Sequence, residues 1–554
     1  MAKVLFAILS KRLYVWAETK QIIPVEQFGF RANHRTVDAM FVLNALIENA
    51  KAKRKNIYSC FVDFKKAFDS VQHHLLWQKL SSIGVSTKLL KLLIDTYAKA
   101  RCCVQLRNNL TESFKCDVGV RQGCPLSPIL FILFTCDLLH ELKHCNGVML
   151  SSCRIPGLMF ADDLVLLADN PKDLQSALNA LSDYCFKWAL TVNESKTRTL
   201  VFGNRQCSFT WTYNGSMLQQ VSSYRYLGVV YSQNGLFTTA VKTLCHSALK
   251  VIYLIKSIYR ENCGLSPDVM CSLYSAMVQP ILEYGCEIWG VKCYSTLERI
   301  PLKFCKDMLG LPLNASNIAV YGETGTYPQW LRNYYRAVKY YVRIHNSAPC
   351  LVVEALELLK KTSGRNWNNT LCGILKQYEP CQSTTASEIS LLGVGKGLQE
   401  SFITKWKEDL WNDKRISGGN KLRTYRSFKV VFAWEHYLSA VTNRSHLTAL
   451  ARFRTSCHSL EIETGRYHKP PIPCEQRVCR ICKSGEVEDE HHFVLDCQPL
   501  DHLRQNLFKT VLKYHPNFSA SSKAEKLVYL FETNNDHIIR KLAWYIYSSF
   551  QHRQ

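Results

Sequence analysis

Three aspartates in the first third of the chain have surroundings that suit a metal-binding group. Asp63 lies near the end of an apolar and aromatic run, residues 57–64, that predicts a buried strand. Asp162 and Asp163 are adjacent within the apolar run 158–168. Burying two neighbouring carboxylates is costly unless a cation compensates their charge. At the tip of a hairpin between buried strands they would emerge at one edge of a sheet, where Asp63 could join them.

Phosphoryl transfer by a polymerase is the chemistry that such a group would serve. Two divalent ions held by carboxylates can activate an attacking 3′ oxygen and stabilise the leaving pyrophosphate. Hard cations of this kind, such as Mg²⁺, prefer oxygen ligands. Asp-Asp is also a common dipeptide of turns, so the pair alone leaves a purely structural role open.

A second group with metal-ligand spacing lies near the C-terminus. A Cys-x-x-Cys pair supplies two thiolates from one tight turn, and a histidine and a third cysteine follow ten and fifteen residues later. Four such ligands complete the tetrahedron of a structural zinc site. The expected ligands are Cys479, Cys482, His492 and Cys497. His491 and Cys474 are alternative ligands, and the residues could also remain reduced and unliganded.

The charge of the chain indicates a polyanionic partner. There are 69 lysines and arginines against 45 aspartates and glutamates among 554 residues, a formal net charge of +24. A basic protein of this size most commonly meets nucleic acid, although a ribosome-associated or membrane-surface protein could have the same charge. With 47% apolar residues the chain can bury a large core, and we expect two to four domains.

Targeting signals are not evident in the sequence. No stretch of about 18 or more apolar residues is present, so we expect neither a membrane-spanning helix nor a membrane partner. The apolar residues 4–9 predict part of an amphipathic helix and form too short a run for a signal peptide. We therefore expect the 24 cysteines to lie in a reducing compartment, the nucleus and cytoplasm, rather than in a secreted protein.

Helix and strand signals alternate over the first 230 residues, and helices dominate from about residue 235. Hairpins are expected at 104–118, around Asn108-Asn109, and at Asn214-Gly215. Residues 361–390 resemble a polar surface connection, and 417–420 should break regular structure. The expected helices span 36–53, 72–80, 87–97, 126–142, 173–188, 240–259 and 266–284, and the expected strands span 57–64 and 199–202, with the run 158–168 around the aspartates.

Six sequence blocks resemble the reverse transcriptases of non-LTR retrotransposons, and they occur in family order. The blocks are Gln27–Arg31, Phe61–Val71, Gly119–Pro128, Phe160–Asp163, Trp188–Thr197 and Tyr226–Gly228. The resemblance implies an α+β fold: a right-hand polymerase palm with partial fingers, a helical thumb and a largely helical C-terminal region that ends in a small zinc-binding module. In this family further motifs lie upstream of Gln27, so we expect a fragment truncated at its N-terminus or a degenerate copy.

The same resemblance implies roles for individual residues. Asp63, Asp162 and Asp163 would bind two Mg²⁺ ions, with Asp163 the least direct ligand. Phe68 would be the steric gate against ribonucleotides, or else a core aromatic residue. Lys196 would assist the leaving pyrophosphate, or else be an ordinary exposed lysine. The residues expected beside template and nucleotide are Phe64, Phe68, Gln122, Gly123 and Phe160.

Two later segments extend the resemblance. Residues 273–285 are similar to the thumb of these enzymes, and residues 488–493 ahead of Cys497 resemble the Cys-Cys-His-Cys segment near the end of their polyproteins. Between them, residues 330–343 interleave aromatic and basic side chains. That mixture suits phosphate contact and base stacking. It equally suits an amphipathic helix with core aromatics and solvated cations.

The resulting hypothesis is an RNA-directed DNA polymerase, a nucleotidyltransferase acting on an RNA template, a DNA primer or target and dNTPs, with no obligate protein partner. The alternative is a decayed or co-opted protein that binds nucleic acid without turnover. A maturase or a telomerase-like protein is a third interpretation, which the Phe-Ala-Asp-Asp block and the terminal cysteine cluster disfavour. Expected domains are fingers and palm at 1–233, thumb at 234–345, a helical connection at 346–448 and a C-terminal region at 449–554, whose zinc module spans about 474–500.

Overall fold

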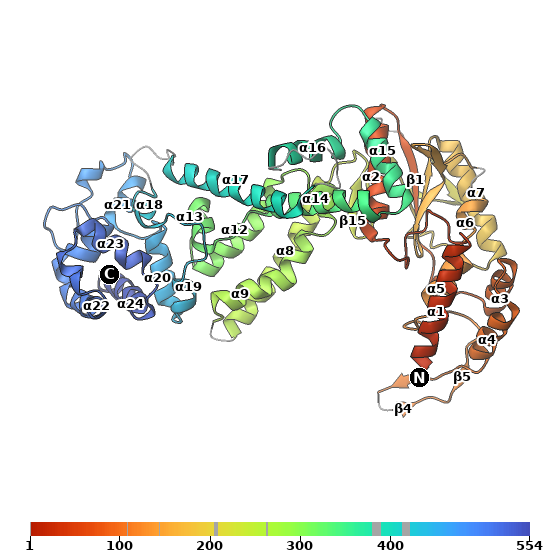
Figure 1. The fold of residues 1–554 in the computed structure, drawn as a ribbon, viewed down its shortest axis with the longest axis horizontal. Coiled ribbons are helices and arrows are strands. Elements are labelled where there is room, and N and C mark those ends of the chain that lie inside the picture. The colour runs from red at the N-terminus through yellow and green to blue at the C-terminus, as the bar shows by residue number, and fades with distance from the viewer. Residues whose placement is uncertain are drawn as a thin grey trace.

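The computed structural model describes residues 2–107, 109–142, 145–203, 209–261, 264–378, 389–412 and 421–553. The molecule is elongated (Figure 1). The strands gather at one end together with the N-terminus, and the C-terminal helices, drawn in blue, form the opposite end. The mixed helix and sheet architecture predicted from the sequence is confirmed.

A five-stranded sheet forms the centre of the N-terminal part. Its strand order is β13-β10-β1-β9-β8, and the central strand runs antiparallel to both neighbours. The strands are β1 (Ile57–Val62), β8 (Gly157–Phe160), β9 (Asp163–Ala168), β10 (Arg198–Phe202) and β13 (Gln219–Gln220). The run 158–168 is therefore a hairpin of two strands, β8 and β9.

Both faces of this sheet are buried, which explains why β1 and β9 are almost continuously apolar. One core cluster contains Cys60, Val62, Leu164 and Leu166. The other contains Phe61, Val165 and Leu167. Since successive side chains point to opposite faces, the two strands supply both clusters alternately.

Helices cover the sheet on both faces. α2 (Thr36–Ala52) contacts β8, while α7 (Pro171–Lys187) contacts β1 and β9. The side chain of Asn170 caps α7 by accepting a hydrogen bond from the backbone N–H of Asp173. The remaining helices of this part are α1 (Ala2–Thr19), α3 (His73–Ser82), α4 (Thr87–Ala98), α5 (Ser127–Phe134) and α6 (Leu138–Glu141).

The long helix expected over 126–142 is wrong, because α5 and α6 are separate helices. The break falls at residues 135–137. There the hydroxyl of Thr135 bonds back to the carbonyl of Phe131, and Asp137 accepts a hydrogen bond from Tyr184 on α7. The polar side chains satisfied at this corner turn the chain, although the residues on either side are buried and apolar.

Small two-stranded ladders flank the sheet. Asn214 and Gly215 connect β11 and β12 with positive φ values of 47° and 79°, as the predicted hairpin requires. Asn108 of the hairpin expected at 104–118 lies outside the described residues. The flanking strands are β2 (Arg101–Cys102), β3 (Gln105–Leu106), β4 (Asn109–Leu110), β5 (Phe114–Lys115), β6 (Val148–Leu150), β7 (Cys153–Ile155), β11 (Thr212–Tyr213), β12 (Ser216–Met217), β14 (Ser223–Tyr226) and β15 (Val229–Ser232).

A helical region follows the sheet. The helix expected over 266–284 contains a π-helical turn at Tyr274–Val278, because Pro280 lacks the N–H that a regular helix needs there. The helices are α8 (Thr238–Glu261), α9 (Pro267–Leu273), α10 (Gln279–Leu282), α11 (Cys286–Trp289), α12 (Ser295–Leu309), α13 (Asn317–Thr324), α14 (Gln329–Ser347), α15 (Cys350–Lys361), α16 (Trp367–Tyr378) and α17 (Leu391–Trp411).

The polar connection expected over 361–390 is wrong in its first half. α16 is a helix whose Trp367 and Leu371 are buried, and Trp367 packs against Phe41 of α2. Buried Asp38 of α2 also accepts hydrogen bonds from Tyr340 and Arg343 of α14. The helical region is thus anchored on the first long helix of the chain.

The C-terminal part is helical, and α17 leads into it (Figure 1). No helix among the described residues combines the length and the hydropathy that crossing a bilayer would demand. The breaker expected at 417–420 lies outside the described residues. The α-helices are α18 (Tyr425–Phe428), α19 (Tyr437–Ala440), α20 (Arg444–Arg454), α21 (Glu461–Thr464), α22 (Asp501–Tyr514), α23 (Lys523–Glu532) and α24 (Asp536–His552). Shorter turns are η5 (Cys474–Gln476), η6 (His492–Asp496) and η7 (Gln498–Leu500).

Candidate active site and metal centre

The strand register brings the three aspartates to one end of the sheet. The last paired residues of β1 and β9 are Val62 and Leu164, so Asp63 and Asp163 take the next facing positions. Asp163 also pairs with Phe160 across the β8–β9 hairpin, which leaves Ala161 and Asp162 as its two-residue turn. The three carboxylates therefore belong to the same edge, as the sequence predicted for a hairpin tip.

The segment Gln27–Arg31 packs against this turn and holds it by hydrogen bonds. Ala161 has a left-handed backbone with φ 58°, and its N–H donates to Gln27 Oε1 at 2.9 Å. Gln27 Oε1 also accepts from the N–H of Gly29 at 2.7 Å. A Cβ at Gly29 would lie 2.2 Å from the nitrogen of Ala161, so only glycine fits. The resemblance of this block was visible in the sequence, whereas its support of the turn depends on the fold.

Asp63 is held by residues of the loop that precedes β10. Asn193 Nδ2 donates to Asp63 Oδ2 at 2.9 Å, and the backbone N–H of Asn193 donates to the Asp63 carbonyl at 2.6 Å. Lys196 Nζ lies 3.9 Å from Asp63 Oδ2, with a largely exposed side chain. Lys196 is thus beside the aspartates, and Asn193 is a site residue that sequence analysis missed, although it lies in a quoted block.

The electrostatics of the three carboxylates suit a divalent cation. Burial raises the pKa of Asp162, and the charge of Asp63 raises it further. Burial also raises the pKa of Asp163, to about 6, and the charges of Asp162 and Asp63 add to the shift. Carboxylates that disfavour one another's ionisation in this way are relieved by a shared cation. The residues present therefore fit Mg²⁺.

A cavity of about 480 Å³ opens beside Asp63. Three lysines on its wall, Lys65, Lys66 and Lys196, give it a cationic lining that could hold a polyphosphate. The full lining is Asp63, Phe64, Lys65, Lys66, Asp69, Ser70, Thr191, Asn193 and Lys196. Phe64 is buried and contributes to this wall, whereas Phe160 is half-buried at the end of β8.

The segment that carries Gln122 is bonded to the loop after Asp63. The N–H of Val120 donates to the carbonyl of Phe68 at 2.8 Å, and Gln122 Nε2 donates to Asp69 Oδ1 at 2.9 Å. Gly123 has φ 78°, and no atom lies within 4 Å of the position a Cβ would take. The backbone conformation thus favours glycine there, and the open space leaves room for a substrate.

Phe68 is half-buried between two other rings. It stacks on Phe131 of α5 with ring centroids 4.5 Å apart and meets Phe30 edge-on at 6.2 Å. This support fixes the orientation of the Phe68 ring. The ring therefore packs on the core and is also partly accessible, so both interpretations of the sequence stay open.

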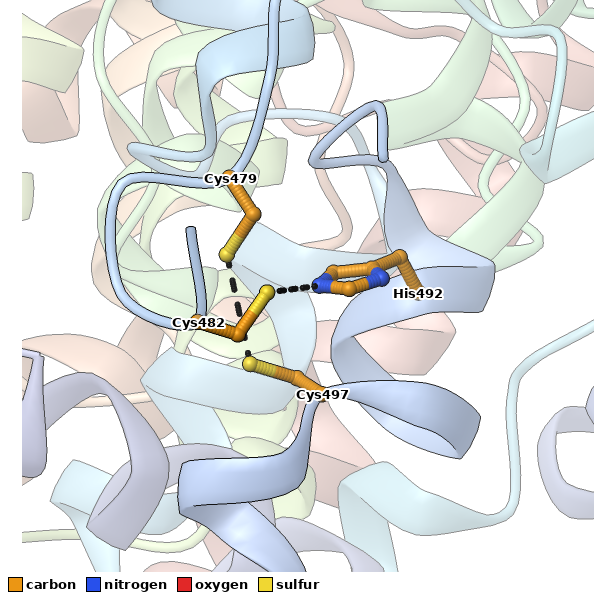
Figure 2. Close-up of side chains that lie close together, drawn as sticks. All are labelled: Cys479, Cys482, His492 and Cys497. Carbon is orange, nitrogen blue, oxygen red and sulfur yellow. Dashed lines mark hydrogen bonds between the residues drawn. The ribbon is translucent and has the colours of Figure 1, made fainter. Parts of the chain in front are cut away.

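At the other end of the molecule, the predicted Cys-Cys-His-Cys residues converge (Figure 2). One potential ligand atom from each of Cys479, Cys482, His492 and Cys497 lies within 4.8 Å of all the others. The sulfurs of Cys479 and Cys497 are 3.9 Å apart, and Cys482 Sγ lies 3.4 Å from His492 Nε2. Neither His491 nor Cys474 belongs to this group.

Tight turns position these ligands. Val478 and Val487 form a β-bridge, and the backbone between them turns through Lys483 and Gly485, both with positive φ. This turn carries Cys479 and Cys482. His492 begins η6 and Cys497 follows its end. The guanidinium of Arg504 donates to the Cys497 carbonyl at 2.6 Å and fixes the backbone there.

Carboxylates surround the group in a way that suits zinc. Glu486 Oε2 lies 2.8 Å from His492 Nδ1, which places the proton on Nδ1 and directs the lone pair of Nε2 toward the sulfurs. Burial opposes ionisation of Cys482, but hydrogen bonds with Ser484 lower its pKa to about 7. Burial and the neighbouring Cys479 raise the pKa of Cys497. Three sulfurs and one imidazole nitrogen are a donor set typical of structural zinc.

The end of the chain closes over this module. The guanidinium of Arg553 donates to both carboxylate oxygens of buried Glu488, at 2.9 and 2.6 Å. Glu488 in turn accepts from the N–H of Glu461 on α21 and lies 3.7 Å from the sulfur of Cys479. The residues around the first cysteine are therefore bound to a residue more than sixty positions later in the chain.

Known proteins match the part of the chain that contains the aspartates. Residues 1–231 match the family model "Reverse transcriptase (RNA-dependent DNA polymerase)". The RNA-directed DNA polymerase from the mobile element jockey of Drosophila funebris is 29% identical over 326 residues, which cover 56% of this chain and 35% of that protein. The Pol polyprotein of retrotransposable element R2 from Nasonia vitripennis is 29% identical over 39% of this chain and 22% of its own length. The chain thus spans about a third or less of these relatives.

Solved structures give a much weaker likeness. The apo telomerase of Candida tropicalis has a TM-score of 0.32 at 12% identity, covering 71% of this chain and 60% of that one. The Candida albicans telomerase bound to a fragment of telomeric RNA has a TM-score of 0.30 at 13% identity, covering 66% of this chain and 59% of that one. The family match and the sequence relatives lead to one conclusion: residues 1–231 form a reverse transcriptase domain whose relatives are polymerases of non-LTR retrotransposons.

Proposed function

We propose that the chain is an RNA-directed DNA polymerase that transfers nucleotides from dNTPs to a primer 3′-OH on an RNA template. The observation that carries the proposal is the register of β1 and β9, which sets Asp63 opposite Asp163 with Asp162 at the adjoining turn. The family match of residues 1–231 supports the same reaction. Two Mg²⁺ ions bound there would activate the 3′ oxygen and neutralise the leaving pyrophosphate.

The side chains around the aspartates have complementary tasks. Lys65, Lys66 and Lys196 line the cavity beside Asp63 and would attract the triphosphate. Lys196 Nζ is exposed and lies 3.9 Å from Asp63 Oδ2, and it would donate a proton to the leaving group. The ring of Phe68, supported by Phe131, would exclude the 2′-hydroxyl of a ribonucleotide.

Gln122 and Gly123 would contact the template and the incoming nucleotide from the other side of this loop. Gln122 is bonded to Asp69 on the cavity wall, and Gly123 has open space above its backbone. Phe64 and Phe160 flank the aspartates and would shape the walls of the site. These roles complete the substrate-binding set inferred from the sequence.

The zinc module would have a structural role. Four protein ligands, Cys479, Cys482, His492 and Cys497, leave no coordination position for water, which distinguishes a structural from a catalytic zinc site. The proposed domains are fingers and palm at 1–233, thumb at 234–345, a connection at 346–448 and the C-terminal region at 449–554. The thiols among the described cysteines suit a reducing compartment, the nucleus or the cytoplasm.

Primer extension tests the proposal directly. The purified full chain is given oligo(dT) on poly(rA), dTTP and Mg²⁺, and we expect extension that Asp162→Asn abolishes. Asp169→Asn is the matched control, because Asp169 forms only a surface ion pair with Arg154. Extension by Asp162→Asn at the wild-type rate would contradict the assigned site. Tight binding of the same oligonucleotides without any extension would favour the alternative, a protein that binds nucleic acid without turnover.

A further inference from the structure

A groove between α14 and α17 lies outside the palm and has a strongly basic wall. Its volume is about 830 Å³, and its lining shares no residue with the cavity beside Asp63. In Figure 1 the two helices occupy the middle of the molecule, between the sheet and the C-terminal part. The cations of the groove are Arg35, Arg332, Arg336, Lys339, Arg343 and Lys396.

Four of these cations form a single stripe on α14. Arg332, Arg336, Lys339 and Arg343 recur at intervals of four, three and four residues, which places them on one helix face. The opposite face is buried, with Ala337 and Val338 fully inaccessible. At 1.5 Å per residue the stripe extends about 16 Å along the helix axis. α14 is therefore amphipathic. The four cations on its polar face line the groove.

The charges of the groove are only partly compensated. Arg336 pairs with Glu283 at 2.9 Å and with Glu287 at 3.1 Å, and these are the two acids of the lining. Arg343 pairs with Asp38 beneath it. Within the described part of the chain, no carboxylate forms an ion pair with Arg332, Lys339 or Lys396, all of which are exposed. The groove thus keeps an excess of positive charge that an anion could neutralise.

Aromatic and apolar groups lie among these cations. Tyr335 is half-buried on the wall of the groove, and a Cβ at Gly395 of α17 would lie 3.4 Å from its ring. That is an ordinary van der Waals distance, so α17 passes directly over this ring. Tyr327 also lines the groove, and Leu392 is 78% exposed at its edge. Rings placed between cations can stack on bases while the cations contact phosphates.

We propose that this groove binds a single-stranded nucleic acid through its phosphodiester backbone. With bases stacked as in one strand of B-DNA, at 3.4 Å per nucleotide, the stripe would span about five nucleotides, and an extended strand would place fewer along it. The end at Arg343 adjoins Asp38 of α2, a few residues after the Gln27–Arg31 segment that holds the catalytic turn. A strand in the groove could therefore continue toward the palm. The inference rests on the proposed function only because that function requires the chain to bind nucleic acid.

The test measures binding without catalysis. Fluorescence anisotropy, without Mg²⁺, compares a 12-nucleotide RNA, a DNA of the same sequence, the corresponding duplex and polyglutamate. The variant Arg332→Glu/Lys339→Glu should bind both single strands at least tenfold more weakly. If two phosphate contacts are lost, the slope of log affinity against log salt should become shallower by about 1.4. The two single-stranded arms show whether the groove prefers RNA or DNA.

A matched control separates the groove from net charge. Lys172→Glu/Lys187→Glu makes the same change in charge on α7 and should leave the affinities within twofold. The milder Arg332→Ala/Lys339→Ala keeps the comparison valid if the charge reversal unfolds the protein. Unchanged affinity for both single strands in either groove variant overturns the proposal. An equal loss for polyglutamate overturns it too, since the groove would then accept any acidic chain.

Catalysis distinguishes the two proposals. Primer extension on a short preformed hybrid that fills only the palm should persist in the groove variants. If the wild-type chain shows no extension but the groove variants lose affinity for single strands, the groove stands and the polymerase proposal fails. If extension proceeds and single-strand affinity is unaffected by the variants, the polymerase proposal stands and the groove fails.

Discussion

Asn193 binds Asp63 twice, with its side-chain amide on the carboxylate at 2.9 Å and its backbone N–H on the carbonyl at 2.6 Å. Asn193 lies three residues before Lys196, so the loop that carries Lys196 is fixed to Asp63, a proposed metal ligand. A displacement of this loop would therefore shift Lys196 or rotate the Asp63 carboxylate. The double contact turns two separate sequence blocks into one structural unit.

Asn193→Ala should lower the rate of primer extension by about tenfold or more. A hydrogen bond to a charged group contributes roughly 1.5–3 kcal/mol, and its loss would let the Asp63 carboxylate rotate away from its ligand position. Single-turnover extension with saturating dNTP measures the effect. Asn179→Ala, which removes an exposed amide contact on α7, is the control. An unchanged rate would show that Asn193 serves only the fold of the loop.

Phe68→Ala should increase ribonucleotide incorporation, because the ring no longer opposes the 2′-hydroxyl. The measurement is the ratio of kcat/KM for a dNTP and its matching rNTP on one primer–template. The loss of stacking on Phe131 should also lower Tm, so Phe68→Leu, which retains apolar bulk, accompanies it. If an active Phe68→Ala protein keeps its sugar selectivity, the ring is core packing alone.

Asp163→Asn should stabilise the metal-free protein near pH 7. The pKa of Asp163 is raised to about 6 by burial and by Asp162 and Asp63, so the folded state holds its proton more tightly than the unfolded chain. The stability of the metal-free wild type should therefore fall as pH rises from about 4 through 6. Thermal melting at pH 4 and pH 7 should show a gain in Tm for the variant only at pH 7. An equal gain at both values would place the cause elsewhere.

Cys482→Ser should loosen the C-terminal module and spare the distant palm. The substitution removes one of the four donors around the proposed zinc. We expect lower nucleic-acid affinity, while extension of a preformed primer largely persists. Metal analysis of wild-type protein purified without chelators is the direct check. Well below one zinc per chain would mean that the cluster is unliganded.

Glu486→Gln should weaken zinc binding without removing a ligand. Glu486 orients His492 through the 2.8 Å contact to Nδ1, and such supporting groups typically change metal affinity by about 10–100-fold. Competition with a chromogenic chelator measures the affinity. Glu475→Gln, on η5 and outside the cluster, is the control. If both variants bind zinc like the wild type, the carboxylate does not position the imidazole.

The sequence predicted local features whose cause is local. The β-strand at 57–64, the hairpin at Asn214-Gly215 and the spacing of Cys479 and Cys482 each follow from neighbouring residues, and the structure contains all three. The placement of Asp63, Asp162 and Asp163 at one end of the sheet followed from a single assumption, a hairpin turn at Asp162. Resemblance supplied the roles that residue types alone could not assign.

The features that the sequence did not predict depend on contacts between residues far apart in the chain. The break at residues 135–137 needs Tyr184 from another helix, and α16 is held by the burial of Trp367 against Phe41. Asn193 became a site residue only once the strand register placed it beside Asp63. The basic stripe of α14 was visible in the sequence, but the groove that collects it requires α17, about fifty residues later. Such long-range pairings leave little trace in a single sequence.

The paired hydrogen bonds from Arg553 to the Glu488 carboxylate have a consequence for folding during synthesis. A ribosome delivers the turn with Cys479 and Cys482 well before it delivers Arg553. While synthesis continues, the carboxylate of Glu488 lacks its guanidinium partner, although the palm strands have already been released in full. The cysteine-rich module should therefore complete its folding later than the palm strands, only after Arg553 has been synthesised.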